Sequence, residues 1–225
     1  MLLSGAYNLG IELSGQQVHL LSMFLDQLWE WNKRMNLTGA SSRTRIIREL
    51  LLDSLIPSLF LPDEGSLLDV GSGAGFPGIP LKVLKEKLTC HLIEANLRKV
   101  NFLRQVIRIT RLKGIAVLRG RIEKDRHLLR PEGYQVVTAR ALTNLQQTLM
   151  WCAPFLAPGG VIVNFQGSQF ENALEGSSEF MKKERLCLFK SIPYTLPGKH
   201  TQRHLIVVMK SAKSVSYTHL TLPTN

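Results

Sequence analysis

Cysteine is scarce in this sequence, and long apolar runs are absent from it. The three cysteines, Cys90, Cys152 and Cys187, are widely separated and odd in number. Such a set excludes a zinc cluster and a disulfide framework and is typical of a protein kept in a reducing compartment. No run of 18 apolar residues and no signal-peptide pattern occurs, so we expect a cytoplasmic protein without a membrane span.

Acidic residues are also few. Only 17 Asp and Glu stand against 28 Lys and Arg, and the net charge of +11 makes a polyanion an expected partner. Residues 98–130 alone contain eleven Lys or Arg and two acids. Arg104, Arg108 and Arg111 share one side of a predicted helix, which favours an RNA-facing or phosphate-facing surface over an ordinary solvated one. A second basic set flanks the first helices: Lys33, Arg34, Arg43, Arg45 and Arg48.

A glycine-rich turn follows a short apolar run. Residues 66–70 have the length and apolar character of a buried parallel strand, and they end in an acid and a valine. Gly71, Gly73 and Gly75 allow a sharp turn and a close approach of the backbone to a ligand. A proline then suits the first turn of the helix predicted at residues 78–86. A strand, a glycine turn and a helix N-terminus together are typical of a nucleotide-type site.

The turn matches two different motifs. Gly73, Gly75 and Gly78 fit the dinucleotide fingerprint G-x-G-x-x-G, whereas the stretch that begins at Asp69 fits the D-x-G-x-G-x-G turn of methyltransferases. An acid beside the helix N-terminus would repel a pyrophosphate, but it can organise the loop around a cationic amino-acid group. The position of Asp69 therefore favours the methyltransferase, although an ordinary strand–turn–helix also fits so short a motif.

A second acid ends the next predicted strand. Residues 89–93 are followed by Glu94, whose carboxylate can accept hydrogen bonds from both hydroxyls of a ribose. This feature serves NAD and S-adenosyl-L-methionine (SAM) equally. The structural alternative is an acid that precedes the helix predicted at residues 97–110. We favour the ribose role because the glycine turn and the acid occur in the expected order and spacing.

The predicted elements indicate an α/β protein. At 225 residues the chain is long enough for one large domain, or for one domain with a helical extension. The first 60 residues have helical periodicity, with one helix beginning after Ser14 and a second at residues 44–56 that stops before Pro57. The alternation that follows implies a doubly wound, mostly parallel sheet with its ligands at the carboxyl ends of the strands. We expect strands at residues 67–70, 89–93, 115–118, 134–138, 160–165, 186–190 and 205–209.

Two further loops of such a fold would face the ligand. After the third strand, the backbone of Ile122 and the side chain of Glu123 are placed to meet an adenine, although Glu123 also suits an exposed helix start. After the fourth strand, Arg140 faces the transferred group. Its guanidinium stays protonated, so it cannot act as a base, but it can bind a phosphate, a carboxylate or a guanine edge. The chain lacks an Asn-Pro-Pro-Tyr motif, which would hold an exocyclic amine. It also lacks a Pro-Cys nucleophile, which would attack C5 of a pyrimidine.

These motifs together resemble those of a known family. The sequence is similar to the bacterial RsmG family, also called glucose-inhibited division protein B, over roughly residues 15–211. The resemblance rests on the stretches 31–38 (WNKRMNLT), 52–54 (LDS), 68–80 (LDVGSGAGFPGIP), 98–103 (RKVNFL), 138–141 (TARA) and 203–205 (RHL).

The resemblance implies a class I SAM-dependent methyltransferase with an N-terminal helical extension. It implies a cytoplasmic enzyme that methylates N7 of one guanine in the helix 18 loop of 16S ribosomal RNA. The family's SAM contacts fall on Gly71, Phe76, the pair Ile122-Glu123, and Arg140. By the fold argument above, these are joined by Asp69, Gly73, Gly75 and Glu94.

The substrate side departs from the family at two positions. The family commonly has a lysine where this chain has Gln166, so a lysine contact to RNA or to the target base would be lost. It often has a histidine before the Leu-Asp-Ser signature, where this chain has Leu50. Neither change touches the cofactor turn. The residues expected to contact RNA are Lys33, Arg34, Arg104, Arg108, Arg121 and Arg203.

The expected organisation has three parts. Residues 1–62 form the helical extension, residues 63–213 form the methyltransferase domain, and residues 214–225 resemble no part of the family and look like a non-native tail. We expect a monomer that acts on 16S RNA, the 30S subunit or an assembly intermediate, without a metal. The alternatives are a methyltransferase of another RNA, a basic NAD-binding oxidoreductase, and an RNA-binding module that has lost catalysis.

Overall fold

The structure is a computed structural model that describes residues 1–168 and 170–211. The tail predicted at residues 214–225 lies outside the described residues, as do the last two residues of the predicted methyltransferase domain. The division predicted between residues 62 and 63 stays a prediction.

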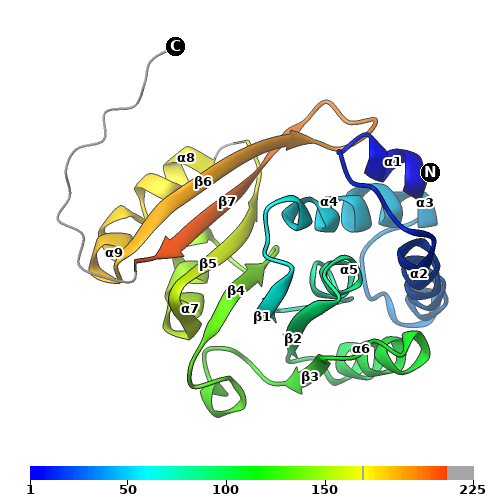
Figure 1. Ribbon diagram of the computed structural model, residues 1–225, viewed down its shortest axis with the longest axis horizontal. Helices are drawn as coiled ribbons and strands as arrows, with labels where there is room; N and C mark the ends of the chain where they lie inside the picture. Colours follow the sequence, from blue (N-terminus) through cyan, green and yellow to red (C-terminus); the bar gives the residue numbers. More distant parts are fainter. Residues whose placement is uncertain (169, 212–225) are drawn as a thin grey trace.

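Seven strands form one sheet in the order β3-β2-β1-β4-β5-β7-β6 (Figure 1). Neighbouring strands from β3 to β5 are parallel, whereas β7 is antiparallel to both β5 and β6. This confirms the expected doubly wound, mostly parallel sheet. The strands are β1 (Glu64–Val70), β2 (Lys87–Glu94), β3 (Ile115–Arg119), β4 (Tyr134–Ala139), β5 (Leu156–Gln166), β6 (Leu186–Thr195) and β7 (Gln202–Lys210).

Several strands are longer than the sequence pattern predicted. β5 begins at Leu156, four residues early, and β6 runs on to Thr195, five residues beyond its predicted end at residue 190. The reason is pairing: β6 and β7 form an antiparallel hairpin whose register extends from Leu186 opposite Lys210 to Thr195 opposite Gln202. None of residues 190–195 of β6 is buried, and they give no apolar run by which the sequence could mark the end of the strand.

Helices cover both faces of the sheet. Two of them, predicted at residues 78–86 and 97–110, are observed as α5 and α6, and the bounds of α6 are those predicted. The α-helices are α1 (Leu2–Tyr7), α2 (Gly15–Met35), α3 (Arg43–Arg45), α4 (Leu52–Leu55), α5 (Gly78–Leu84), α6 (Leu97–Thr110), α7 (Leu145–Cys152), α8 (Phe170–Glu175) and α9 (Ser178–Lys183).

The single helix predicted at residues 44–56 is wrong in detail. The chain forms α3, then a π-helical turn η1 (Ile46–Leu51), then α4, and then a 3-10 turn η2 (Ile56–Leu59) that continues past Pro57. Proline sits in the first turn of η2, where its missing N–H leaves no bond unmade. The π-helical turn widens the backbone ladder, so carbonyl groups in this segment become available to side chains from elsewhere.

Alternate residues of the central strands enter two separate cores. Leu67 packs into the core shared with α2, α4, α5 and α6, whereas Leu68 packs into the core shared with α7 and α9. Figure 1 shows the N-terminal helices beside α5 and α6, with α7, α8 and α9 on the other side of the sheet. A strand buried on both faces reads as a continuous apolar run, which is why the sequence identified β1.

The N-terminal helix α2 is fixed to the glycine turn by aromatic packing. Ser14 and Gln17 form a capping box at its start. Further along, the ring of Phe24 lies 5.1 Å from that of Phe76 in the turn and 6.4 Å from that of Phe102 in α6. The N-terminal helices therefore share one core with the part of the sheet that leads into the glycine turn. Among the described helices, none is long and apolar enough to cross a membrane.

Candidate cofactor and active site

The glycine turn closes over the end of β2. The backbone N–H groups of Gly71 and Ser72 both donate to the carbonyl of Ile93, at 3.0 and 3.1 Å. Gly71 has φ +66°, and a Cβ at this residue would lie 2.8 Å from the side chain of Leu142. A side chain at this position would be strained in its backbone and would push against the loop after β4. Glycine is therefore required here by geometry.

The carboxylate of Glu94 joins two loops. One oxygen accepts the N–H of Gly73 at 2.9 Å, and the other accepts the N–H of Asn96 at 2.7 Å. The backbone carbonyl of Glu94 accepts the N–H of Gly120 at 3.1 Å. The acid at the end of β2 thus organises the glycine turn, the start of α6 and the loop after β3. A carboxylate oxygen has more than one lone pair, so these bonds leave acceptor capacity for a ligand.

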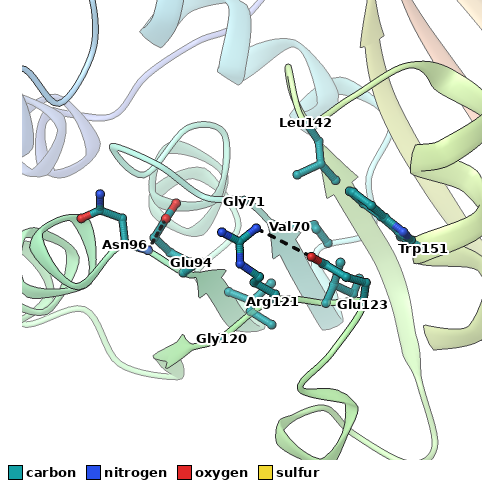
Figure 2. Close-up of a pocket in the computed structure, with 12 residues that line it drawn as sticks. Val70, Gly71, Glu94, Asn96, Gly120, Arg121, Glu123, Leu142 and Trp151 are labelled. Atoms are coloured by element: carbon teal, nitrogen blue, oxygen red, sulfur yellow. Dashed lines mark hydrogen bonds and ion pairs between the residues drawn. The ribbon is translucent and has the colours of Figure 1, made fainter.

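A cavity of about 510 Å³ opens where these loops meet. Figure 2 shows Glu94 and Asn96 on one side of it and Leu142 and Trp151 on the other. It lies at the carboxyl ends of β1, β2 and β3, where ligands of such sheets bind. Its wall is made by Val70, Gly71, Ile93, Glu94, Ala95, Asn96, Gly120, Arg121, Ile122, Glu123, Leu142 and Trp151.

The loop after β3 supplies another wall of the cavity. The Asp125 carboxylate accepts the N–H of Arg121 at 2.8 Å and so closes a short turn. Within this turn Ile122 is buried, and the carboxylate of Glu123 lies 3.7 Å from the guanidinium of Arg121. Ile122 and Glu123 were predicted at the adenine. Arg121, predicted to contact RNA, lines the cavity as well. The ligand contacts of all three stay predictions.

Asp69 lies beneath the turn. Its carboxylate is fully buried and accepts hydrogen bonds from the hydroxyl of Thr138 at 2.8 Å and from the N–H of Gly78 at 3.1 Å. Burial raises the pKa of Asp69 to about 6, against the opposing effect of these hydrogen bonds. A Cβ at Gly78 would lie 2.3 Å from Leu92 and 2.7 Å from the Asp69 carboxylate, so α5 begins unusually close to the strands. Asp69 holds β1, β4 and α5 together, and its contact with a cofactor stays a prediction.

Three other predicted cofactor residues lie away from the cavity wall. Phe76 is buried against α2, and Gly73 and Gly75 shape the turn with φ of +57° and +93°. A Cβ at Gly75 would lie 2.6 Å from Ile79, so this glycine serves the packing of the turn on α5. A cofactor contact by these residues stays a prediction.

Arg140 points into the N-terminal helices. Its guanidinium donates to the carbonyls of Glu49 at 2.7 Å and Leu50 at 3.3 Å, and it lies 3.2 Å from the carboxylate of Asp53. Phe165 lies under it, with the ring centroid 5.8 Å away. Burial lowers the pKa of Arg140 from its usual high value, while Asp53 opposes that shift. The role predicted for Arg140 at the reacting group is not tested by this geometry.

Of the two departures from the family pattern, Leu50 contacts Arg140, and Gln166 is linked through Asn164 to the residue before Arg140. Gln166 donates a hydrogen bond to the side chain of Asn164, whose amide in turn donates to the carbonyl of Ala139 at 3.1 Å. The carbonyl of Leu50 accepts from Arg140 and, at 2.6 Å, from the hydroxyl of Ser54. Both positions therefore support the chain around the end of β4.

The predicted RNA-contacting residues occupy several surfaces. Arg104 and Arg108 are exposed on α6, and Arg108 is held by Gln105 at 2.8 Å. Lys33 pairs with Glu30 at 2.7 Å near the end of α2, and Arg34 is exposed beside it. Arg203 is different, because it extends from β7 to within 3.3 Å of the Asp53 carboxylate. The structure groups Arg203 with Arg140 instead of with α6.

Several residues of the cavity were not identified from the sequence, among them Leu142, Trp151 and Asn96. Leu142 and Trp151 form its apolar side, but both occur in stretches whose apolar residues look like ordinary core. Asn96 caps α6, and its side chain accepts from the N–H groups of Arg98 at 2.9 Å and Lys99 at 3.4 Å. An asparagine directly before a predicted helix is a recognised N-cap signal. That signal could have placed Asn96 at the carboxyl end of β2.

The cavity fits an adenosine-containing ligand in its chemistry. It offers two carboxylates for hydroxyl groups, an apolar side for a base, and a turn without side chains against which a ligand can lie. Among residues 1–168 and 170–211, no group of three His, Cys, Asp or Glu is placed to hold a metal ion.

Comparison with known proteins identifies the family. The model of the GidB family, described as rRNA small subunit methyltransferase G, matches residues 17–206. A curated relative of that name from Syntrophobacter fumaroxidans is 39% identical over 199 residues, which cover 87% of this chain and 89% of the relative. Another, from Alkaliphilus metalliredigens, is 33% identical over 213 residues, covering 93% of this chain and 89% of the relative.

Solved structures agree on the fold. A SAM-dependent methyltransferase from Aquifex aeolicus superposes with a TM-score of 0.58 at 16% identity, over 77% of this chain and 97% of that one. A precorrin-6y C5,15-methyltransferase from Geobacter metallireducens superposes with a TM-score of 0.53 at 15% identity, over 76% and 90%. The strand order also differs from the 3-2-1-4-5-6 order of dinucleotide-binding folds, because β7 lies between β5 and β6. The chain belongs to the GidB family of small-subunit ribosomal RNA methyltransferases.

Proposed function

We propose that this protein transfers the methyl group of SAM to N7 of a guanine in the helix 18 loop of 16S ribosomal RNA. The observation that carries the proposal is the cavity at the ends of β1, β2 and β3, in a chain of this family. It is walled by Gly71 and Glu94 and bordered by the loop after β4. The methylated atom and the loop come from the family resemblance.

Glu94 and Glu123 are the residues suited to hold the cofactor's hydroxyl groups and the amino group of its base. The Glu94 carboxylate is largely buried and already fixed by two backbone N–H groups, so it is pre-organised to accept further hydrogen bonds. Leu142 and Trp151 supply the apolar surface against which a base would pack. When bound, SAM supplies a methyl group on a positively charged sulfur.

Arg140 and its neighbours would serve the substrate side. Guanine N7 carries a lone pair and no proton, so its methylation needs no general base. The task of the chain is to hold N7 in line with the methyl group, and such positioning can supply several kcal/mol of the barrier, up to about 11. Arg140 stays protonated and takes no proton during the reaction. It acts by position and charge.

The basic surfaces suit RNA. Arg104 and Arg108 lie on α6, Lys33 and Arg34 lie at the end of α2, and Arg203 lies near Arg140. Phosphate contacts of this kind supply affinity and orientation without reading sequence. The substrate would be 16S RNA in a 30S subunit or its assembly intermediate, which requires a cytoplasmic enzyme. We propose that a monomer suffices, since one chain carries the cavity and the basic surfaces.

Methyl transfer to ribosomal subunits tests the proposal. The protein would be incubated with tritiated SAM and 30S subunits from cells that lack this modification, with fully modified subunits as the matched control. We expect label in the RNA of the unmodified subunits alone. Label in neither sample, with SAM bound in calorimetry, would contradict the proposed substrate. Absence of SAM binding would contradict the cofactor assignment itself.

A further inference from the structure

One buried carboxylate connects three distant parts of the chain. Asp53 is completely buried in α4. One of its oxygens accepts the hydroxyl of Tyr194 at 2.6 Å and lies 3.3 Å from the guanidinium of Arg203. The other oxygen lies 3.2 Å from the guanidinium of Arg140. The N-terminal helices, the loop after β4 and the β6–β7 hairpin therefore meet at this one side chain.

Arg140 is held from two sides. Besides Asp53, it donates to the carbonyls of Glu49 and Leu50, which belong to the π-helical turn η1. The Glu49 carboxylate is engaged elsewhere, with Arg45 at 2.9 Å and Lys199 at 2.8 Å. Asp53 is thus the acid in contact with Arg140. Its fully buried carboxylate faces two guanidinium charges, of which that of Arg140 is largely buried and that of Arg203 is partly exposed.

The anchored arginine lies next to the wall of the cofactor cavity. The residue after it, Ala141, has φ +48°, a left-handed conformation that is unusual for alanine. The next residue, Leu142, lines the cavity and lies against Gly71. A side chain that fixes Arg140 on one side of this tight turn also limits where Leu142 can lie on the other.

We propose that Asp53 is a positioning residue, which acts through Arg140 to set the loop between β4 and the cofactor cavity. Tyr194 and Arg203 hold the carboxylate in the orientation that Arg140 requires. The consequence for methyl transfer rests on the proposed function, whereas the consequence for SAM affinity rests only on the cavity. Loss of the negative charge leaves the largely buried guanidinium of Arg140 and the partly exposed guanidinium of Arg203 without their shared carboxylate. Arg140 is the one whose displacement disturbs the cavity.

A double-mutant cycle tests this coupling. Asp53→Asn keeps the volume and an acceptor for Tyr194 but removes the charge. We expect Asp53→Asn to lower kcat/KM for methyl transfer at least 10-fold and to weaken SAM binding measurably in calorimetry. Both measurements are made well below the unfolding temperature of the variant. In an Arg140→Gln background the same change should cost less than 2-fold more, because residues that act as a unit are not additive. Asp63→Asn, an exposed acid paired with Lys85, is the matched control and should change neither quantity.

The outcomes separate this proposal from a purely structural role and from the proposed function. Equal losses in the wild-type and Arg140→Gln backgrounds, or full activity of Asp53→Asn, would overturn the coupling. If Asp53→Asn does not fold, Tyr194→Phe replaces it in the cycle; we expect a loss of about 3-fold that vanishes in the Arg140→Gln background, and additivity would again overturn the proposal. If the wild-type protein transfers no methyl group, the proposed function fails, and the cycle is then decided by SAM affinity alone.

Discussion

The Glu94 carboxylate accepts the backbone N–H of Gly73 at 2.9 Å, so the acid at the end of one strand fixes the glycine turn at the end of its neighbour. We therefore expect Glu94→Ala to weaken SAM binding by about 1.5–3 kcal/mol, the scale of a hydrogen bond to a charged group. The change removes an acceptor for the cofactor and also releases the turn. Calorimetry at constant salt would measure the SAM affinity of the wild type and of Glu94→Ala.

The control for this variant is Glu132→Ala. Glu132 is an exposed acid paired with Arg130 at 2.6 Å, and it is not among the cavity residues. The Glu132→Ala substitution removes the same charge as Glu94→Ala but changes no residue of the cavity. An unchanged SAM affinity in Glu94→Ala, or an equal loss in both variants, would contradict the assigned role of Glu94.

The raised pKa of Asp69 predicts an unusual dependence of the free energy of unfolding on pH. Its pKa is raised by burial from 3.8 to about 6, so the folded chain binds this proton more tightly than the unfolded chain does. Protonation of Asp69 therefore stabilises the folded state as pH falls from about 6 toward 4, and the free energy of unfolding gains about 1 kcal/mol between pH 6 and pH 5 from this group. Above pH 7 this contribution is absent.

The comparison of wild type with Asp69→Asn isolates that contribution. Asparagine has nearly the same shape and can still accept the N–H of Gly78. Denaturant unfolding at pH 7, 6 and 5 should show the wild type gaining stability relative to the variant as pH falls. A constant difference across this range would mean that Asp69 ionises with an ordinary pKa despite its burial.

Removal of the Arg140 guanidinium should slow the reaction without unfolding the chain. We expect Arg140→Ala to lower turnover about 100-fold, the effect of a misplaced reacting group. The measurement is single-turnover methyl transfer, accompanied by circular dichroism of the folded protein. Turnover at the wild-type rate in a folded Arg140→Ala protein would remove Arg140 from any role in the reaction.

The surface of α6 should contribute salt-dependent affinity for RNA. Arg104→Ala combined with Arg108→Ala is expected to lower the slope of log affinity against log salt by about 2 in magnitude, one for each lost phosphate contact. Lys182→Ala with Lys183→Ala on α9 removes the same charge from another surface and should leave the slope within error of wild type. Equal changes in both double variants would mean that net charge, not the α6 surface, governs binding.

Much of the fold was predictable because its signals are local. The buried strand before Gly71 is a continuous apolar run, and α6 has both an N-cap at Asn96 and a clear apolar face. The full length of the exposed strand β6 and the π-helical turn η1 were not predictable in this way. The length of β6 depends on its pairing with β7. The form of η1 depends on hydrogen bonds from the guanidinium of Arg140, about ninety residues away in the chain.

The residues of the site show the same difference between local signals and distant partners. The sequence placed Glu94, Ile122 and Glu123 at a cavity because each follows the carboxyl end of a strand. It placed Arg140 by the same argument, but the orientation of a long side chain is decided by its partners. Asp53 and the carbonyls of η1 bind the guanidinium among the N-terminal helices. No local pattern around Arg140 predicts that contact.

The most direct test of the central claim is the position of the methyl group in the RNA. After transfer to 30S subunits that lack the modification, borohydride and aniline treatment cleaves the RNA at 7-methylguanine, and primer extension locates the break. We predict a single cleavage in the helix 18 loop of 16S RNA. Transfer of label without cleavage would contradict N7 as the acceptor, and cleavage elsewhere would contradict the helix 18 loop.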